Sequence, residues 1–195
     1  MSRKFSLLLI LLFVLTFSGI YAQDDQDWFD YDFSLYSRGD KTFHITMGLL
    51  FPLYFSGINN NNHGISMGGT GTLTFNYFLD SHFFVGGEVS GSFTGTRGGN
   101  MLYLIPIGVR AGYQFLYRRF EIPVTLMLGV APQRYLDKGY LGPILKAGAA
   151  GYWRYNMDWS FGLNTNLWVI PQWPNNGNNV VGTFQELTLS ARFHF

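Results

Sequence analysis

The stretch LTLSARFHF, residues 187–195, ends the chain and decides the fold class. Its apolar side chains alternate with polar or charged ones up to the last residue, which is the pattern of a β-strand with two different faces. The last residues of most domains are poorly ordered unless a sheet or a docked helix holds them. A strand that stays apolar to its end therefore indicates a sheet that needs that strand in full. The apolar positions are Leu187, Leu189, Ala191, Phe193 and Phe195.

The composition indicates one β-rich domain and excludes several functional classes. The chain has 195 residues, of which 13% are charged and 18% aromatic, and it has 24 glycines and no cysteine. Charged residues make up about 25% of an ordinary soluble domain. A net charge of +1 gives no reason to expect a nucleic-acid partner. The four histidines are scattered without the spacing of metal ligands, so we expect no metal site and no cofactor.

The N-terminus reads as an export signal. Residues 1–22 comprise a basic start, MSRK, then the apolar run FSLLLILLFVLTF and a stretch of small and neutral residues that ends at Ala22. This order predicts a secretory signal peptide that is cleaved after Ala22, and the alternative is an uncleaved anchor helix. Because the chain has no cysteine, a lipid-anchored lipoprotein and a disulfide framework are both excluded.

Residues 23–40, QDDQDWFDYDFSLYSRGD, are acidic and show no clear period. Six aspartates and one arginine give this segment a net charge of −5. We predict a mobile acidic arm that precedes the folded domain, which we place at residues 41–195.

From Lys41 onward the chain alternates between apolar and polar residues, which favours strands. Short turns and longer Gly- and Asn-rich loops alternate between the strands, as in an up-and-down meander. An even number of strands lets such a meander close without free edges. We therefore predict an all-β fold, an eight-stranded antiparallel up-and-down barrel. The predicted strands are 42–55, 65–78, 82–94, 101–116, 120–131, 141–155, 159–171 and 183–195.

One phase of each strand is almost purely apolar, and the other phase carries the mid-strand charges. In the strand 120–131, for example, Ile122, Val124, Leu126 and Leu128 share one face. The opposite face of the sheet holds Glu88, Arg110, Glu121, Lys146, Arg154, Glu186 and Arg192.

Two kinds of barrel fit this alternation. A lipocalin-like soluble barrel would line its cavity with the apolar phase, whereas a membrane barrel turns that phase toward lipid. The apolar phase carries no charge over strands of 12 or more residues, and about 9–11 tilted residues suffice to span a bilayer. Aromatic residues also gather at the strand ends beside the short turns, as in the interfacial girdles of membrane barrels. These features predict a transmembrane β-barrel in contact with outer-membrane lipid.

The stretch 187–195, with alternating hydrophobes and a final phenylalanine, resembles the sorting signal that the bacterial barrel assembly machinery reads. A signal peptide followed by eight strands resembles the OmpA/OmpX/OmpW-like family of small outer-membrane proteins. The resemblance implies a monomer in the outer membrane, with both termini and the short turns in the periplasm and the longer loops outside. It also implies that the assembly machinery is a partner of the C-terminal strand. The stretch lacks the glycine that is often seen in this signal.

The charged residues of the inward phase are candidates for a gate. Folding each hairpin about its loop places Glu88 opposite Arg110 and Glu121 opposite Arg154, whereas Lys146 and Glu186 share a level on either side of Trp168. An eight-stranded barrel leaves room only for side chains inside. The charges could exchange partners to open a very narrow pore, or they could simply compensate one another in a low-dielectric interior. We favour the second interpretation.

The sequence thus predicts an integral outer-membrane barrel with a structural role or a very narrow pore. An interaction protein that uses the outer loops or the acidic arm is the alternative. A lipid A-modifying enzyme also exists on this kind of scaffold, but it needs a His–Ser–acid set at the lipid face. His63 and Ser66 lie near one loop without an acid beside them, so we predict no catalytic residue and no enzyme.

Overall fold

The computed structural model describes residues 36–56, 65–96, 100–135, 138–172 and 180–195. They lie in one compact unit, Ser34–Phe195. The predicted signal peptide, residues 1–22, and residues 23–35 of the predicted arm lie outside the described residues. Within the described part of the chain, no helix has the length and hydropathy of a membrane span.

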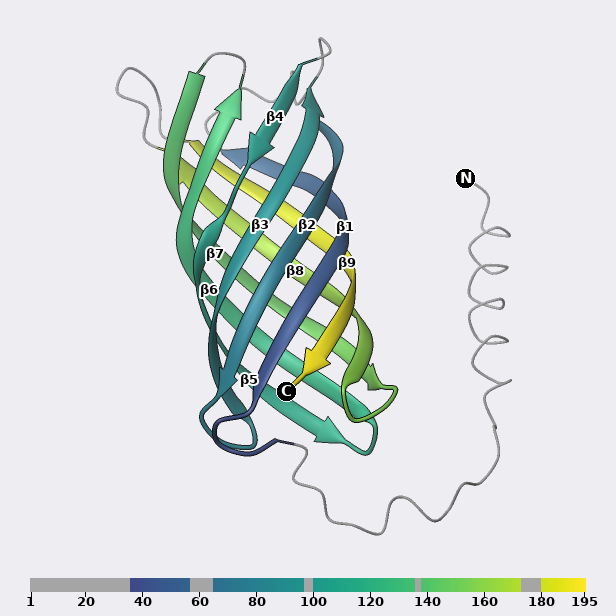
Figure 1. Ribbon diagram of the computed structural model, residues 1–195. Coiled ribbons are helices and arrows are strands. Elements are labelled where there is room, and N and C mark those ends of the chain that lie inside the picture. Colours follow the sequence, from purple (N-terminus) through teal and green to yellow (C-terminus); the bar gives the residue numbers. More distant parts are fainter. Residues whose placement is uncertain (1–35, 57–64, 97–99, 136–137, 173–179) are drawn as a thin grey trace, which may run out of the picture. The chain divides into compact units, whose positions relative to one another are not determined.

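The described residues form one closed antiparallel sheet (Figure 1). Apart from β4 and β5, each strand pairs with the next one along the chain, and β9 returns to pair with β1. β4 and β5 follow one another in the same position between β3 and β6, so nine strands make an eight-stranded barrel. The strands are β1 (Lys41–Ser56), β2 (Ile65–Phe78), β3 (Phe83–Thr96), β4 (Met101–Leu104), β5 (Ile107–Tyr117), β6 (Phe120–Tyr135), β7 (Lys138–Arg154), β8 (Trp159–Gln172) and β9 (Val180–His194).

The last strand closes the barrel, which confirms the predicted fold. The β1–β9 ladder runs from Thr42 opposite His194 to Ser56 opposite Val181. Beyond it, the Lys41 N–H donates to the Phe195 carbonyl at 3.0 Å, and the Phe195 N–H donates to the Lys41 carbonyl at 3.1 Å. The final residue is therefore part of the seam, and a shorter chain would leave backbone groups unpaired.

The predicted strand 101–116 is wrong in one respect, because it is interrupted. Ile105 and Pro106 separate β4 from β5. Proline has no N–H to donate to a ladder, so a break is expected at this position. The barrel stays closed across the break, because the Ser90 N–H donates to the Pro106 carbonyl at 2.8 Å and the Ile105 N–H donates to the Pro132 carbonyl at 2.9 Å.

The predicted loop 132–140 is also corrected. β6 continues to Tyr135 and β7 begins at Lys138, with these two residues opposite each other in the ladder. Pro132 has no N–H to donate, but its carbonyl accepts a hydrogen bond from the Ile105 N–H, so β6 stays paired past this residue. β1 differs from the prediction as well: its register shifts between Pro52 and Tyr54, so that Leu53 and Tyr54 are both exposed.

The distribution of side chains is the reverse of that in a soluble protein. Large apolar residues cover the outer surface, and Met47, Val109 and Leu189 are 71%, 70% and 68% exposed. Threonines, serines and charged residues are buried inside the barrel, among them Glu121, which is fully buried. Apolar atoms are normally removed from water on folding, so this outer surface needs a non-aqueous environment.

The inside of the barrel is not polar throughout, which the alternation did not predict. An apolar cluster fills one part of it, and its members face inward from β1, β4, β6, β7, β8 and β9. Along β9, Arg192, Glu186 and Phe184 succeed one another with increasing distance from the C-terminus. The apolar cluster consists of Leu50, Leu104, Met127, Ala131, Ile144, Trp168, Ile170 and Phe184.

We call one end of the barrel the turn end. It holds the tight turns 79–82, 118–119 and 155–158, together with residues 36–40 and the C-terminus (Figure 1). Arg118 adopts a left-handed conformation there, with φ 53°, in the two-residue turn between β5 and β6. Tyr36 is 2% exposed and packs against Phe78 and Phe84. The folded domain therefore begins before residue 41, and the last residues of the predicted mobile arm belong to it.

Candidate functional site

The candidate site is the interior of the barrel, where the seven charged residues gather in two clusters. The central ion cluster consists of Glu88 from β3, Arg110 from β5, Lys146 from β7 and Glu186 from β9. Arg110 Nη1 lies 3.0 Å from Glu88 Oε2, and Lys146 Nζ lies 3.1 Å from Glu186 Oε2. Lys146 Nζ also forms an ion pair with Glu88 Oε1. Two cations and two carboxylates thus form one chain across the lumen with a net charge of zero.

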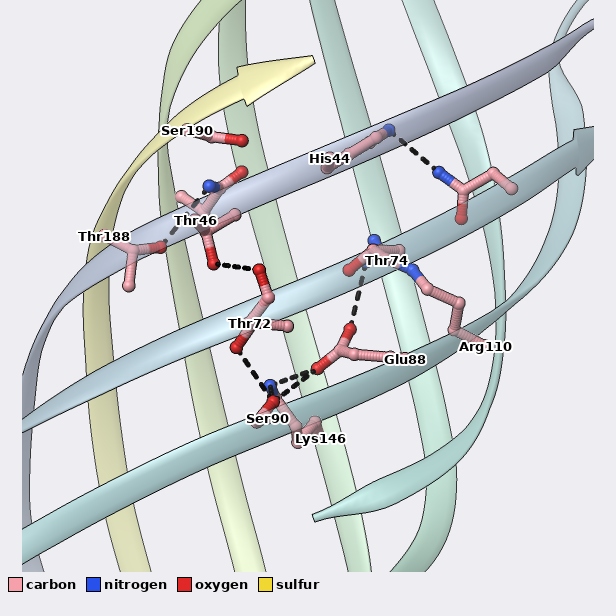
Figure 2. A network of polar contacts seen from close by, with 12 residues as sticks. His44, Thr46, Thr72, Thr74, Glu88, Ser90, Arg110, Lys146, Thr188 and Ser190 are labelled. Carbon is pink, nitrogen blue, oxygen red and sulfur yellow. Dashed lines mark hydrogen bonds and ion pairs between the residues drawn. The ribbon is translucent and has the colours of Figure 1, made fainter. Parts of the chain in front are cut away.

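Neutral donors complete the central ion cluster, and Figure 2 shows one of them, Ser90, beside Glu88 and Lys146. The Trp168 indole N–H donates to Glu186 Oε2 at 2.6 Å, and Lys146 Nζ lies 4.5 Å from the centre of the Trp168 ring. The Ser90 hydroxyl donates to Glu88 Oε1 at 3.4 Å. All of these side chains are mostly buried, and Lys146 is 3% exposed. Buried charges are tolerated when they are paired and hydrogen-bonded, as these are.

The turn-end ion cluster consists of Glu121 from β6, Arg154 from β7 and Arg192 from β9. Arg192 Nη1 lies 2.7 Å from Glu121 Oε2, and Arg154 Nη1 lies 3.4 Å from Glu121 Oε1. Gln114 accepts from Arg192 Nη1 at 3.0 Å. Two cations share one carboxylate, so this cluster carries a net charge of +1. Arg192 also lies 3.8 Å from the centre of the Tyr152 ring, a cation–π contact that stabilises the excess charge.

Two aromatic side chains that the sequence did not single out belong to this region. The Tyr36 hydroxyl donates to Glu121 Oε2 at 2.7 Å and lies 3.1 Å from His194 Nδ1. Burial raises the pKa of the Tyr36 phenol, so it is present as a hydrogen-bond donor. The Tyr152 hydroxyl donates to Asn164 Oδ1 at 2.8 Å. Tyr36 lies in a segment without strand periodicity, so no pattern identified it.

A third inward-facing group lies next to the turn-end ion cluster. His44 Nε2 is 2.9 Å from the Thr42 hydroxyl and 3.0 Å from Asn76 Nδ2, and His44 is fully buried. The hydrogen-bond partners of His44 are therefore neutral. Figure 2 shows His44 on β1, near Thr74 of the neighbouring strand β2. His44 alternates with outward residues on β1, so its inward direction follows from the strand period.

The space left inside is small. A cavity of about 20 Å³ is lined by both carboxylates of the central ion cluster and by Arg110, Thr46 and Thr125, among others. About 10–15 Å³ is the minimum that holds one water molecule. This cavity therefore has room for about one water molecule and none for an organic solute.

The structure brings together the residue pairs that folding the hairpins suggested. Glu88 and Arg110 form a diagonal pair and are not directly opposite each other. Glu88 lies across from Gly108, and Arg110 lies across from Gly86. Two pairs were not foreseen, Lys146 with Glu88 and Arg192 with Glu121. These pairs join strands that are not neighbours in the sheet, and only the size and shear of the closed barrel bring them within reach.

The residues of the predicted assembly signal lie along the outer face of β9. Leu187 and Leu189 are exposed, Phe195 is 58% exposed, and Ala191 and Phe193 are half-buried. The Phe195 ring packs against Phe193, with 5.7 Å between centroids. These residues form one continuous apolar strip at the seam of the barrel.

No metal or catalytic centre is found among the described residues. No group of three or more His, Asp or Glu side chains in this part of the chain could hold a metal ion. The Ser160 hydroxyl lies 2.8 Å from His194 Nε2, and Ser160 is fully buried inside the barrel. His63 lies outside the described residues.

The chain has relatives in Treponema pallidum. A sequence profile of a protein family matches residues 22–193. A protein of Treponema pallidum (strain Nichols), named only as an uncharacterized protein, is 40% identical over 172 residues, which cover 80% of this chain and 78% of that protein. A second protein of the same strain is 32% identical over 68 residues, or 35% of this chain and 23% of that protein.

Three solved structures share the fold at low sequence identity. Neisserial surface protein A is 11% identical, with a TM-score of 0.61, and the match covers 80% of this chain and 97% of that one. The outer membrane protein OprG from Pseudomonas aeruginosa is 13% identical, with a TM-score of 0.55 and coverage of 84% and 99%. Ail of Yersinia pestis, solved with the heparin analogue sucrose octasulfate, is 13% identical, with a TM-score of 0.51 and coverage of 81% and 99%.

Proposed function

The chain belongs to the family of the 40% identical Treponema pallidum protein, and we propose that it is an integral outer-membrane β-barrel with a structural role and a filled, non-conducting lumen. The observation that carries this proposal is the reversed distribution of side chains. Apolar side chains are exposed on the outside, whereas Glu88, Lys146, Glu186 and Arg192 are buried inside. The likeness to OprG, an outer membrane protein, supports the location.

The location is tested by cell fractionation. We expect the protein in the outer membrane, and we expect its band in detergent gels to shift only after boiling, because a closed hydrogen-bonded barrel resists unfolding. Recovery as a soluble periplasmic protein would contradict the proposal. The same material tests the orientation, in which we place the turn end in the periplasm. A protease added to intact cells should then cleave only at the end of the barrel away from the turn end.

The partners follow from the location. We propose that the protein is a monomer that is surrounded by lipid and that is inserted by the barrel assembly machinery through its C-terminal strand. The seam formed by β1 and β9 supports the monomer, because it leaves no sheet edge that would need a second chain. The exposed apolar strip on β9 supports the role in assembly.

The non-conducting lumen is tested by electrical recording. We expect the purified protein in a planar bilayer to give no conductance above that of the lipid alone. Support comes from the cavity of about 20 Å³ among the charged residues, which has room for about one water molecule, and from the apolar cluster that fills another part of the lumen. Discrete conductance steps from the wild-type protein would refute the structural role and favour a narrow pore.

One observation favours the gate as a second candidate. Glu88 is shared between Arg110 and Lys146, so it could exchange one cation for the other without becoming unpaired. A gate at this point predicts that Glu88→Ala combined with Arg110→Ala increases the conductance of small ions. If the double variant folds and remains silent, the charges only compensate one another.

A further inference from the structure

The turn end of the lumen contains a pocket that is filled by one side chain, Tyr36. The Tyr36 ring stacks on Phe78 with 4.0 Å between centroids and an angle of 11° between the planes. Phe84 and the half-buried Leu116 complete the apolar wall, and the Arg154 guanidinium lies 5.5 Å from the centre of the Tyr36 ring. Tyr36 is 2% exposed, so the pocket encloses it almost completely.

The far end of this pocket is shaped for a hydroxyl group. The Tyr36 hydroxyl donates to Glu121 Oε2 at 2.7 Å and accepts from Arg192 Nη1 at 3.3 Å. His194 Nδ1 lies 3.1 Å from the same oxygen, and the Ser160 hydroxyl lies 2.8 Å from His194 Nε2. We assign the histidine proton to Nδ1, because Nδ1–H can then donate to the phenol oxygen while Ser160 donates to Nε2. The phenol oxygen thereby makes one donated and two accepted hydrogen bonds.

Tyr36 is held mainly by its side chain. It precedes the first strand, and the hydrogen bonds that tie this segment's backbone to the barrel begin at Gly39, whose N–H donates to the Phe78 carbonyl at 3.0 Å. Residues 37–40 form a turn in which the Ser37 N–H donates to Asp40 Oδ2 at 2.8 Å. Gly39 in this turn has a φ of 103°, which a residue with a Cβ rarely adopts. A short turn thus connects the ring to the barrel and can swing outward without breaking the sheet.

The pocket itself is formed by the barrel and does not depend on the segment that fills it. Phe78, Phe84, Glu121 and Arg192 all lie on strands. Gly112 on β5 makes room for the wall, because a Cβ at this position would overlap the Phe84 ring. The pocket has a closed bottom, since the central ion cluster and the apolar cluster lie beyond it.

We propose that the turn end of the lumen is a binding pocket for phenols, and that Tyr36 occupies it as a tethered ligand. When residues 36–38 swing away and the bonds of Gly39 and Asp40 to Phe78 stay in place, the pocket accepts a small phenol, or the tyrosine of another chain, in place of Tyr36. The stacked wall recognises the aromatic ring, and the Glu121–Arg192–His194 set recognises the hydroxyl. The residues that form this pocket belong to the turn end, so the proposal is independent of whether the lumen conducts.

The experiment empties the pocket and refills it. Tyr36→Ala removes the tethered ligand, and p-cresol, which is the side chain of tyrosine as a free molecule, is then added to the folded barrel in detergent. We expect the variant to lose its folded gel band at a lower temperature than wild type and p-cresol to restore most of the loss in a saturable manner. Toluene, which lacks the hydroxyl, should bind at least tenfold more weakly. A peptide with the sequence of residues 34–40 tests whether a tyrosine from another chain competes with the free phenol.

Matched controls separate binding in the pocket from partition into micelles. Wild type and Tyr36→Phe keep a ring in the pocket, so p-cresol should not raise their melting temperatures. Adding Glu121→Gln to Tyr36→Ala should abolish the preference for p-cresol over toluene. If Tyr36→Ala does not fold alone, it is refolded with p-cresol or toluene, and a yield restored by p-cresol alone supports the pocket.

Three outcomes would overturn the proposal. Equal effects of p-cresol and toluene would show that the hydroxyl is not recognised. An equal effect on wild type and Tyr36→Ala would place the phenol in the detergent or at the outer surface. The absence of any effect on melting temperature and on refolding yield would show that Tyr36 only fills space.

Discussion

Lys146 is the residue on which the central ion cluster depends, and replacing it tests the arrangement of charges. It pairs with both Glu88 and Glu186, whereas Arg110 pairs with Glu88 alone. Lys146→Met keeps most of the side-chain volume and its packing on Trp168 but removes the charge. Glu186 then keeps only the Trp168 indole N–H among its partners named above. Arg110→Met is the matched control, because it also removes one buried cation.

The expected costs differ because the two changes leave different charges uncompensated. Lys146→Met leaves Glu186 without a cation, and removing one partner of a buried ion pair costs about 3–5 kcal/mol. Arg110→Met also leaves one excess negative charge, but both carboxylates still contact Lys146, so we expect a smaller cost of about 1.5–3 kcal/mol, that of one hydrogen bond to a charged group. Adding Glu186→Gln to Lys146→Met should recover about 0.5–3 kcal/mol, the usual size of coupling between neighbours. The Arg110–Glu88 pair then remains, with no excess charge.

The free energies of unfolding are measured by urea titration of the barrels in lipid vesicles at neutral pH. Tryptophan fluorescence reports on Trp168 in the cluster, and the folded gel band reports independently on the closed barrel. The reasoning would be refuted if Arg110→Met cost as much as Lys146→Met. It would also be refuted if Glu186→Gln made the Lys146→Met variant less stable.

Four further substitutions test other parts of the structure. Leu126→Arg should cost about 2–4 kcal/mol in bilayers and much less in detergent, because Leu126 is 49% exposed on the outer surface. Thr125→Arg should be costly both in bilayers and in detergent, because Thr125 lines a cavity of only about 20 Å³. If the cost of Thr125→Arg differed between bilayers and detergent as much as that of Leu126→Arg, the inner and outer faces would be misassigned. Phe195→Ala keeps the backbone hydrogen bonds between residue 195 and Lys41, so refolding in pure lipid vesicles should change little. Insertion in cells should fall much more. Equal losses in the two assays would contradict recognition of Phe195 by the assembly machinery. The Asp80 carboxylate accepts hydrogen bonds from the N–H groups of Phe83 and His82, and these bonds hold the pKa of Asp80 below its usual value. Its contribution to stability is therefore present above the unfolded-state pKa. That contribution is lost as the pH falls through the lower, folded-state pKa. Asp80→Asn should abolish that part of the acid sensitivity in thermal unfolding, and an unchanged pH profile would contradict this assignment.

The alternation of apolar and polar residues was enough to predict the closed eight-stranded barrel. A period of two fixes which side chains face in and which face out, and the tight turns fix the order of the strands. The inward direction of Glu88, Glu121 and Lys146 followed from the same rule. The subfamily, the OmpA/OmpX/OmpW-like assignment, stays a prediction, because a likeness to solved structures at 11–13% identity shows the fold alone.

The parts that were missed depend on contacts across the barrel. Folding hairpins relates only neighbouring strands, so it could not pair Lys146 on β7 with Glu88 on β3. Alternation also says which face a residue takes but not what fills the space, so the inward-facing Leu50 and Phe184 were not recognised as a separate layer. Tyr36 was missed for a third reason, because its position depends on a turn and on a pocket rather than on a strand.

The order of the layers inside the barrel bears on the choice between a gate and a filler. Within the described residues, the lumen is closed at the turn end by Tyr36, then by the two ion clusters, and then by the apolar cluster. Obstacles in series must all open before a solute passes, so an exchange of partners by Glu88 would still leave Leu50 and Phe184 in the path. The apolar cluster has no charge that such an exchange could move, and opening it would expose buried apolar surface to water, at roughly 25 cal/mol for each Å². A rearrangement of the central ion cluster alone would leave these apolar side chains in place, which supports our proposal that its charges compensate one another inside a filled barrel.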